Sequence, residues 1–134
     1  IGYCTACYAC KKTGKCVIKD DAAAIFKKMM AADVIVFGAP AYFYSCPAQL
    51  KALFDRSVVI YPNLINKQYY YLLVQADENK EMFAGTIKSL DGFLDCYEGS
   101  KLKGMVAAPG FYEKGTIKDS KYITQAYKLG LKVK

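Results

Sequence analysis

Four of the six cysteines in this chain lie between positions 4 and 16, in the stretch CTACYACKKTGKC. Their spacing is Cys4-x2-Cys7-x2-Cys10-x5-Cys16. Thiolates at successive x2 intervals can turn inward around one centre, and Gly14 allows the chain to bend back and deliver the fourth. Compact runs that start with C-x2-C-x2-C hold iron–sulfur clusters, whereas structural zinc sites more often pair two separated C-x2-C knuckles. The spacing therefore favours an iron–sulfur cluster.

Two other interpretations of the cysteines stay open. They could bind zinc, or they could form a reduced, metal-free loop in which they pack as small apolar residues. For a cluster, Lys11, Lys12 and Lys15 would offset the negative charge of the four thiolates. We expect Cys96 in the core, because it sits late in a predicted helix, and we expect Cys46 to pack beside the predicted ligand edge.

The overall composition excludes several classes of site. The sequence contains no histidine, so this chain supplies no histidine base, no Ser-His-Asp triad and no histidine-ligated metal. Its net charge of +7 suits anionic ligands such as nucleotides or flavin phosphates, or is a solvated lysine surface. The lysines are scattered, which argues against nucleic acid as a partner. No apolar run approaches the roughly 20 residues of a membrane span, and clustered cysteines without an export signal favour a reducing cytoplasm.

The order of apolar segments predicts how the chain folds. An unbroken apolar run at Val34–Phe37 predicts a strand buried on both faces, and Tyr69–Ala76 and Gly104–Gly110 predict two further strands. Predicted helices follow Asp20–Asp21, begin near Pro47, span Glu81–Tyr97, and carry Ile123, Tyr127 and Leu131 on one face. The helix near Pro47 should bury Leu50, Leu53 and Phe54 and expose Lys51, Asp55 and Arg56.

Strands and helices alternate, which predicts an open α/β fold with a parallel sheet and right-handed crossovers. Residues 1–134 form one predicted domain, with residues 1–19 as its cysteine-rich cluster loop. Ligands of such folds bind beyond the carboxyl ends of the strands. Here those ends read GAPAYFY, QADEN and AAPGFY. We therefore expect the active edge at these three segments.

The combination CTACYACKKTGKCVIKDD and ADVIVFGAPAYFYSCPAQLKALFDR resembles the NAD(P)H-dependent FMN reductase group of the flavodoxin-like fold. Within that group it resembles the iron–sulfur flavoproteins most. The resemblance extends over essentially the whole chain and is strongest from Ile1 to Arg56. It implies a flavodoxin-like, doubly wound parallel sheet, of which this chain contains three strands. It also implies that the four clustered cysteines, Cys4, Cys7, Cys10 and Cys16, hold a 4Fe–4S cluster.

The resemblance further implies an FMN site on two loops. The residues that would contact FMN are Ala39, Pro40, Ala41, Tyr42, Phe43, Tyr44, Ala76 and Asp77. Independently of the family, Pro40 stiffens the turn, and the three aromatic side chains that follow can cover a ring face. The alternative is an aromatic plug that joins strand to helix. Asp77 departs from the small residues usual there and would bring negative charge near the flavin.

The predicted function is that of an FMN-dependent oxidoreductase. It would pass electrons between NAD(P)H or ferredoxin, FMN and an acceptor, through a 4Fe–4S cluster and as a homo-oligomer. Alternatives are a reductase of the NAD(P)H:FMN or quinone type without a cluster, a non-catalytic flavodoxin-like electron carrier, and a zinc-stabilised module. The family also opens with a strand and a phosphate-binding loop, so we expect a further βα unit of roughly 30 residues or more upstream of Ile1. The order of elements places the cysteine loop at the flavin end of the sheet.

Overall fold

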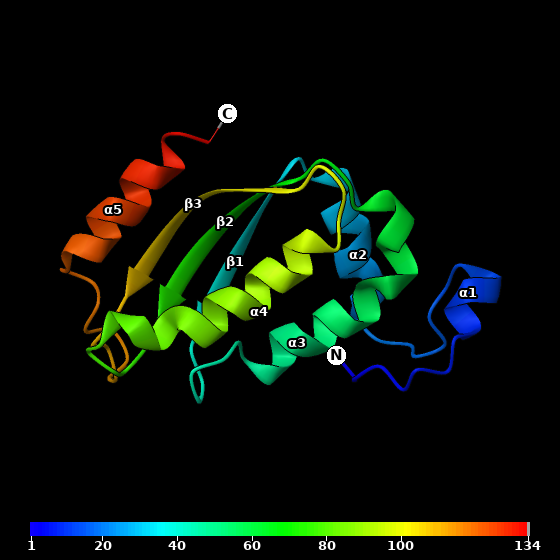
Figure 1. Ribbon diagram of the computed structural model, residues 1–134, viewed down its shortest axis with the longest axis horizontal. Helices are drawn as coiled ribbons and strands as arrows, with labels where there is room; N and C mark the ends of the chain where they lie inside the picture. Colours follow the sequence, from blue (N-terminus) through cyan, green and yellow to red (C-terminus); the bar gives the residue numbers. More distant parts are fainter. Residues whose placement is uncertain (134) are drawn as a thin grey trace.

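Three parallel strands form a single sheet in the order β1-β2-β3 in the computed structural model, which describes residues 1–133 (Figure 1). The strands are β1 (Val34–Pro40), β2 (Gln68–Val74) and β3 (Lys101–Ala108). The helices are α1 (Ala9–Thr13), α2 (Ala22–Ala31), α3 (Ala48–Arg56) and α4 (Ala84–Asp95), followed by α5 (Lys121–Gly130), with 3-10 turns η1 (Ser57–Asn63) and η2 (Lys80–Phe83). The predicted alternation and the parallel sheet are confirmed. Both predicted later strands begin and end a few residues earlier than expected.

One face of the sheet carries the hydrophobic core. Side chains of α2, α3, η1 and α4 pack together with the inward residues of β1 and β2. Aromatic rings dominate its centre: Phe54 stacks on Phe93 with ring centroids 4.1 Å apart, and Phe37 meets Phe54 edge-on at 5.2 Å. Buried rings of this size each remove a large apolar area from water, which is the main driving force for this side of the fold.

The other face of the sheet is covered in part by α5, which packs on β3, and Tyr70 of β2 is also buried on this face. Helix and strand approach closely at Gly104, where an added Cβ would lie 2.4 Å from Leu129 Cδ1. Farther along this face, Val36 is 52% exposed and Leu72 is 38% exposed. The prediction that Val34–Phe37 is buried on both faces was therefore wrong, because an apolar run reports the preference of the side chains and not which helix covers them.

Two further expectations about burial differ from the structure. Cys96 is exposed, although it was expected in the core, because its position at the end of α4 turns it away from the sheet. The apolar stripe of α5 formed by Ile123, Tyr127 and Leu131 lies in solvent, since the opposite side of the helix packs on β3. Across the part of the chain that the structure describes, no helix has the length and apolar character to cross a bilayer.

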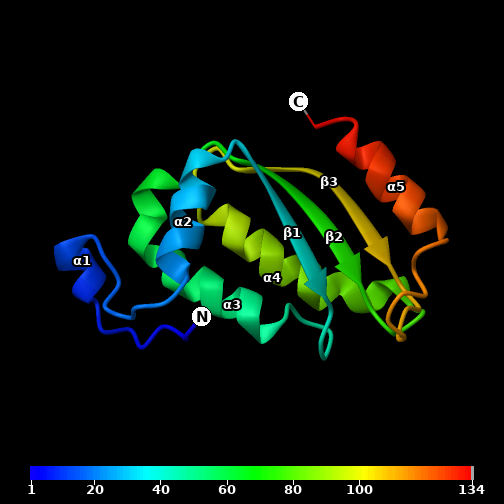
Figure 2. The same cartoon turned by 180° about the vertical axis from the view of Figure 1, so that it is seen from behind.

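The cysteine segment, which we define as residues 4–16, lies far from the carboxyl ends of the strands. The strand arrowheads point to one end of the long axis of the molecule, and α1 lies at the other end (Figures 1 and 2). The cysteine segment packs beside the C-terminal end of α3 and the start of η1. The prediction that this loop sits at the flavin end was wrong, because α3 runs back along the sheet before it meets the loop.

Candidate functional site

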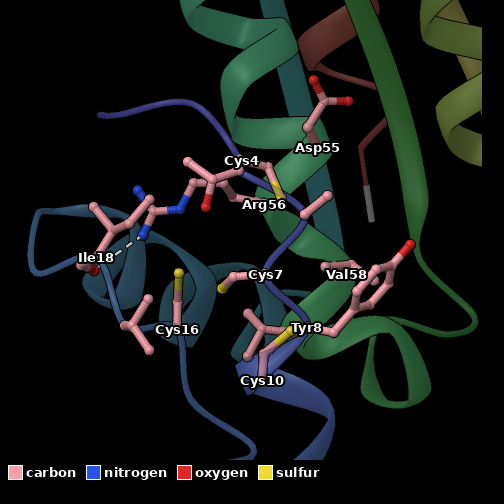
Figure 3. Close-up of a pocket in the computed structure, with 13 residues that line it drawn as sticks. Cys4, Cys7, Tyr8, Cys10, Cys16, Ile18, Asp55, Arg56 and Val58 are labelled. Carbon is pink, nitrogen blue, oxygen red and sulfur yellow. Dashed lines mark hydrogen bonds between the residues drawn. The ribbon is translucent and has the colours of Figure 1, made fainter.

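All four predicted cluster ligands line one cavity of about 210 Å³ (Figure 3). Cys4 and Cys7 are exposed, and Cys10 and Cys16 are half-buried. Figure 3 shows the sulfurs of Cys7 and Cys16 pointing toward one another across this space. The fold thus gathers thiols spread over the whole N-terminal stretch, as the spacing predicted. We call this space the cysteine cavity.

Backbone conformation curls the segment around the cysteine cavity. Ala6 and Tyr8 adopt left-handed conformations with φ of 53° and 57°, and α1 ends at Gly14 with φ of 66°. The Gly14 N–H donates to the Cys10 carbonyl at 2.9 Å. A left-handed conformation costs a residue with a side chain about 1–2 kcal/mol. Left-handed residues between right-handed ones turn N–H groups inward and form the anion-binding concavities found at iron–sulfur sites.

A single ion and a multi-atom cluster make different demands on the spacing of four cysteine sulfurs. A tetrahedral zinc ion holds each sulfur at about 2.3 Å, which puts the sulfurs roughly 4 Å apart. Within residues 1–133, no three metal-binding side chains come together in such an ion-sized group. A 4Fe–4S cluster keeps its four ligands farther apart, because iron and sulfide atoms lie between them. The four cysteines line one shared space, where either kind of centre would have to be held.

Arg56 closes the cysteine cavity from the side of α3. It was expected to face water, but it is only 2% exposed because the cysteine segment folds over the end of the helix. Burial lowers the pKa of Arg56. The hydrogen bond to Asp20 and the nearby Cys16 together raise it by more, so the pKa of Arg56 lies above its usual value. In turn, the hydrogen bond from Arg56 holds the pKa of the Asp20 carboxyl well below its usual range. The pair is therefore charged throughout the ordinary pH range.

A second cavity, of about 400 Å³, lies at the carboxyl ends of the strands, and we call it the edge cavity. Its walls include four of the predicted FMN-binding residues, Pro40, Ala41, Tyr42 and Ala76. The remaining four do not line it: Ala39 is buried inside β1, and Phe43, Tyr44 and Asp77 form the neighbouring hairpin and loop. Sequence reasoning missed the wall formed by residues 113–117, although the AAPGFY strand end pointed to its beginning at Phe111 and Tyr112.

An unusual two-residue hairpin stands beside the edge cavity. Tyr42 and Ser45 exchange two backbone hydrogen bonds of 3.0 Å, and the residues between them, Phe43 and Tyr44, have φ of 48° and 58°. Turns of this kind normally use Asn-Gly, since both central residues must be left-handed. Here the turn presents Phe43, which is fully exposed. Strained backbone that surrounding contacts maintain is concentrated at functional sites.

The loop after β2 is hydrogen-bonded to the side chain of Tyr44. The Tyr44 hydroxyl donates to Asp77 Oδ2 at 3.1 Å, and this bond raises the pKa of Tyr44. The other oxygen of Asp77 accepts the Asn79 N–H at 2.8 Å. One carboxylate oxygen of Asp77 is therefore bonded to the hairpin and the other to its own loop.

Gln75 joins the strand ends behind the edge cavity. Its side-chain amide donates to the carbonyls of Asp77 and Asn79 at 3.0 and 2.7 Å, and its backbone carbonyl accepts the Phe111 N–H at 2.9 Å. Its Oε1 atom is buried and accepts no hydrogen bond within residues 1–133. A buried acceptor without a partner costs about 1–3 kcal/mol. A ligand N–H donor would satisfy it, and the aromatic lining together with Lys114 suits a ring that carries an anionic group.

Comparisons with known proteins bear on the family and the fold of this chain. Residues 2–83 match the family model described as NADPH-dependent FMN reductase. The chain is similar to an iron–sulfur flavoprotein of Methanosarcina thermophila, with 56% identity over 57 residues. That match covers 42% of this chain and 30% of the relative, so it spans less than a third of the relative's length.

Two solved structures share the fold. One is the Trp repressor binding protein from Bacillus subtilis, with a TM-score of 0.71 and 21% identity, over 84% of this chain and 71% of that one. The other is the general stress protein 14 of Treponema denticola in complex with FMN, with a TM-score of 0.58 and 17% identity, over 91% of this chain and 78% of that one. The sheet is thus of the flavodoxin-like α/β type, as expected. On the family match, the chain belongs to the NADPH-dependent FMN reductase family.

Proposed function

We propose that the protein is an FMN-dependent oxidoreductase that passes electrons between NAD(P)H or ferredoxin, FMN and an acceptor through a 4Fe–4S cluster. The observation that carries the proposal is the pair of cavities: one is lined by four cysteines, and the other lies at the strand ends beside an aromatic hairpin. The names of the iron–sulfur flavoprotein relatives support the cluster, and the family supports the flavin.

The chemistry is carried by the bound groups. A flavin exchanges two electrons with a hydride donor and single electrons with a cluster. The chain's own residues bind and orient. In this proposal the hairpin of Tyr42–Ser45 covers one side of the flavin ring, Gln75 Oε1 accepts a ring N–H, and Cys4, Cys7, Cys10 and Cys16 hold the cluster. No histidine is available for proton transfer, which suits a role in electron transfer.

Separation of the two cavities supports a homo-oligomer. They share no lining residue, and α1 and the carboxyl ends of the strands lie toward opposite ends of the long axis (Figure 1). A second copy that brings its cysteine cavity to the edge cavity of the first would shorten the electron path. Exposed, free thiols such as Cys4 and Cys7 oxidise readily, so we place the protein in a reducing cytoplasm. The upstream βα unit with an FMN phosphate loop stays a prediction.

Absorption spectroscopy with elemental analysis tests this function. Anaerobically purified protein should be brown, with broad absorption near 400 nm and with iron and acid-labile sulfide, and it should bind FMN. Cys7→Ser should lose iron, while Cys96→Ser, at an exposed cysteine outside the cysteine cavity, should keep it. A yellow protein with freely titrating thiols would instead indicate the reductase without a cluster, and stoichiometric zinc would indicate the zinc-stabilised module. Ferredoxin reduction without NAD(P)H oxidation would indicate the electron carrier.

A further inference from the structure

Arg56 is the only arginine in the sequence, and every other basic residue is lysine. Lysine offers a flexible point charge, whereas arginine offers a rigid planar fork of five N–H donors. The fork is used here: Arg56 makes three hydrogen bonds from a side chain that is only 2% exposed. A single arginine placed where a fork is needed suggests a specific role.

The fork joins both ends of the cysteine segment. Nη1 donates to the Gly2 carbonyl at 3.2 Å and to Asp20 Oδ2 at 2.5 Å, and Nη2 donates to the Ile18 carbonyl at 3.2 Å. Gly2 lies two residues before the first cysteine, and Ile18 lies two residues after the fourth. Figure 3 shows Arg56 extending above Cys16 toward Ile18. One side chain thus holds the residues that come just before the first cysteine and just after the fourth.

Asp20 completes this clamp. Its Oδ2 also accepts the Gly2 N–H at 2.8 Å, and its Oδ1 accepts the Ala22 N–H at 3.1 Å, at the start of α2. The same carboxylate therefore links the beginning of the segment, Arg56 and the following helix. The ends of the segment are held by bonds that involve no cysteine, so the clamp does not depend on a bound metal.

One donor of Arg56 is left over. Its Nε–H is buried and has no acceptor within the described part of the chain, on a side chain that lines the cysteine cavity. An unpaired donor on a buried charged group is costly. The acceptors that a loaded cysteine centre would add nearby are sulfurs, from cysteine thiolates or sulfide. Hydrogen bonds to such sulfurs, and nearby positive charge, raise the reduction potential of a cluster.

We propose that Arg56 is the positioning residue of the cysteine centre: its Nη groups clamp the two ends of the cysteine segment, and its Nε–H donates to a sulfur of the bound centre. This inference rests on the proposed cluster function. It assigns to one side chain both the assembly of the ligand set and the tuning of its potential.

The test uses the intact protein and three variants. Arg56→Lys keeps the charge without the fork, Arg56→Met removes both, and Lys67→Met is the matched control. Lys67 Nζ donates to the Met30 carbonyl at 2.8 Å and does not line the cysteine cavity. The readouts are iron and sulfide per chain, the rate of cluster loss to a chelator, the midpoint potential by anaerobic dye titration, and circular dichroism as a measure of folding.

Loss of an outer-shell partner typically weakens a metal site 10–100-fold, so cluster loss should accelerate by about that factor in Arg56→Lys, more in Arg56→Met, and not in Lys67→Met. The midpoint potential should become more negative in Arg56→Met and move less in Arg56→Lys. Wild-type loss rate and potential in a folded Arg56→Lys would overturn the inference, whether or not Arg56→Met folds. Wild-type protein that assembles no cluster would overturn the proposed function itself, so the two failures are distinguishable.

Discussion

Replacing Gly85 by alanine should disturb the hairpin beside the edge cavity, whereas the same change at Gly92 should not. Both glycines lie in α4, so both variants change the same helix. An added Cβ at Gly85 would lie 2.2 Å from the backbone carbonyl oxygen of Tyr44, while at Gly92 it would meet nothing within 4 Å. A backbone atom cannot rotate away, so either the helix or the hairpin must move.

The magnitudes follow from these contacts. Alanine is favoured over glycine inside a helix by about 1 kcal/mol, so Gly92→Ala should raise the free energy of unfolding by about that amount. At Gly85 the overpacking costs about 1–3 kcal/mol, which cancels or exceeds the gain. The two variants should therefore differ by about 1–3 kcal/mol in unfolding free energy. At about 4 °C per kcal/mol for a domain of this size, Gly85→Ala should melt about 4–12 °C below Gly92→Ala.

Thermal denaturation followed by circular dichroism measures this difference, and FMN titration followed by flavin fluorescence measures its consequence at the site. We expect Gly85→Ala to bind FMN on the order of tenfold more weakly, because the hairpin is displaced. This corresponds to a loss of about 1.4 kcal/mol in binding free energy. Gly92→Ala should bind FMN as the wild type does. If Gly85→Ala were as stable as Gly92→Ala, the close approach of helix and hairpin would not constrain the site, and the reasoning would fail.

Three other perturbations give further tests. Phe43→Gly should stabilise the fold by about 0.5–1 kcal/mol in urea denaturation, because it relieves a left-handed side chain, and should weaken FMN binding; unchanged binding would exclude ring coverage by Phe43. Burial raises the pKa of Tyr69 to about 12. Between pH 10 and 12 the unfolded chain therefore releases a proton that the folded chain keeps, and the free energy of unfolding should fall across this window. Tyr69→Phe should reduce that fall in urea titrations, and an equal fall in the variant would contradict the prediction. Ser57→Ala should cost about 1–3 kcal/mol, because Ser57 Oγ lies 2.5 Å from the buried Tyr97 hydroxyl; Tyr97→Phe combined with it should recover part of that loss in the same assay.

The sequence by itself determined the order of the elements and which cysteines gather in one place. Cysteine spacing predicted one shared centre, and all four thiols line the cysteine cavity. Alternating apolar segments predicted the parallel sheet. The strand ends, including Pro40, Ala41, Tyr42 and Ala76, marked the edge cavity. These features are local, because residue type, spacing and strand direction are all written in neighbouring positions.

Only the tertiary structure decided which segments bury which residues. Helical periodicity placed Arg56 on the wet side of α3, but the cysteine segment from the start of the chain packs over it and buries it. The apolar run at β1 gave no sign that Val36 would be exposed, since that depends on how far α5 extends across the sheet. The separation of the two cavities depends on the direction in which α3 returns along the sheet. Contacts between segments distant in sequence set all three, and no local pattern records them.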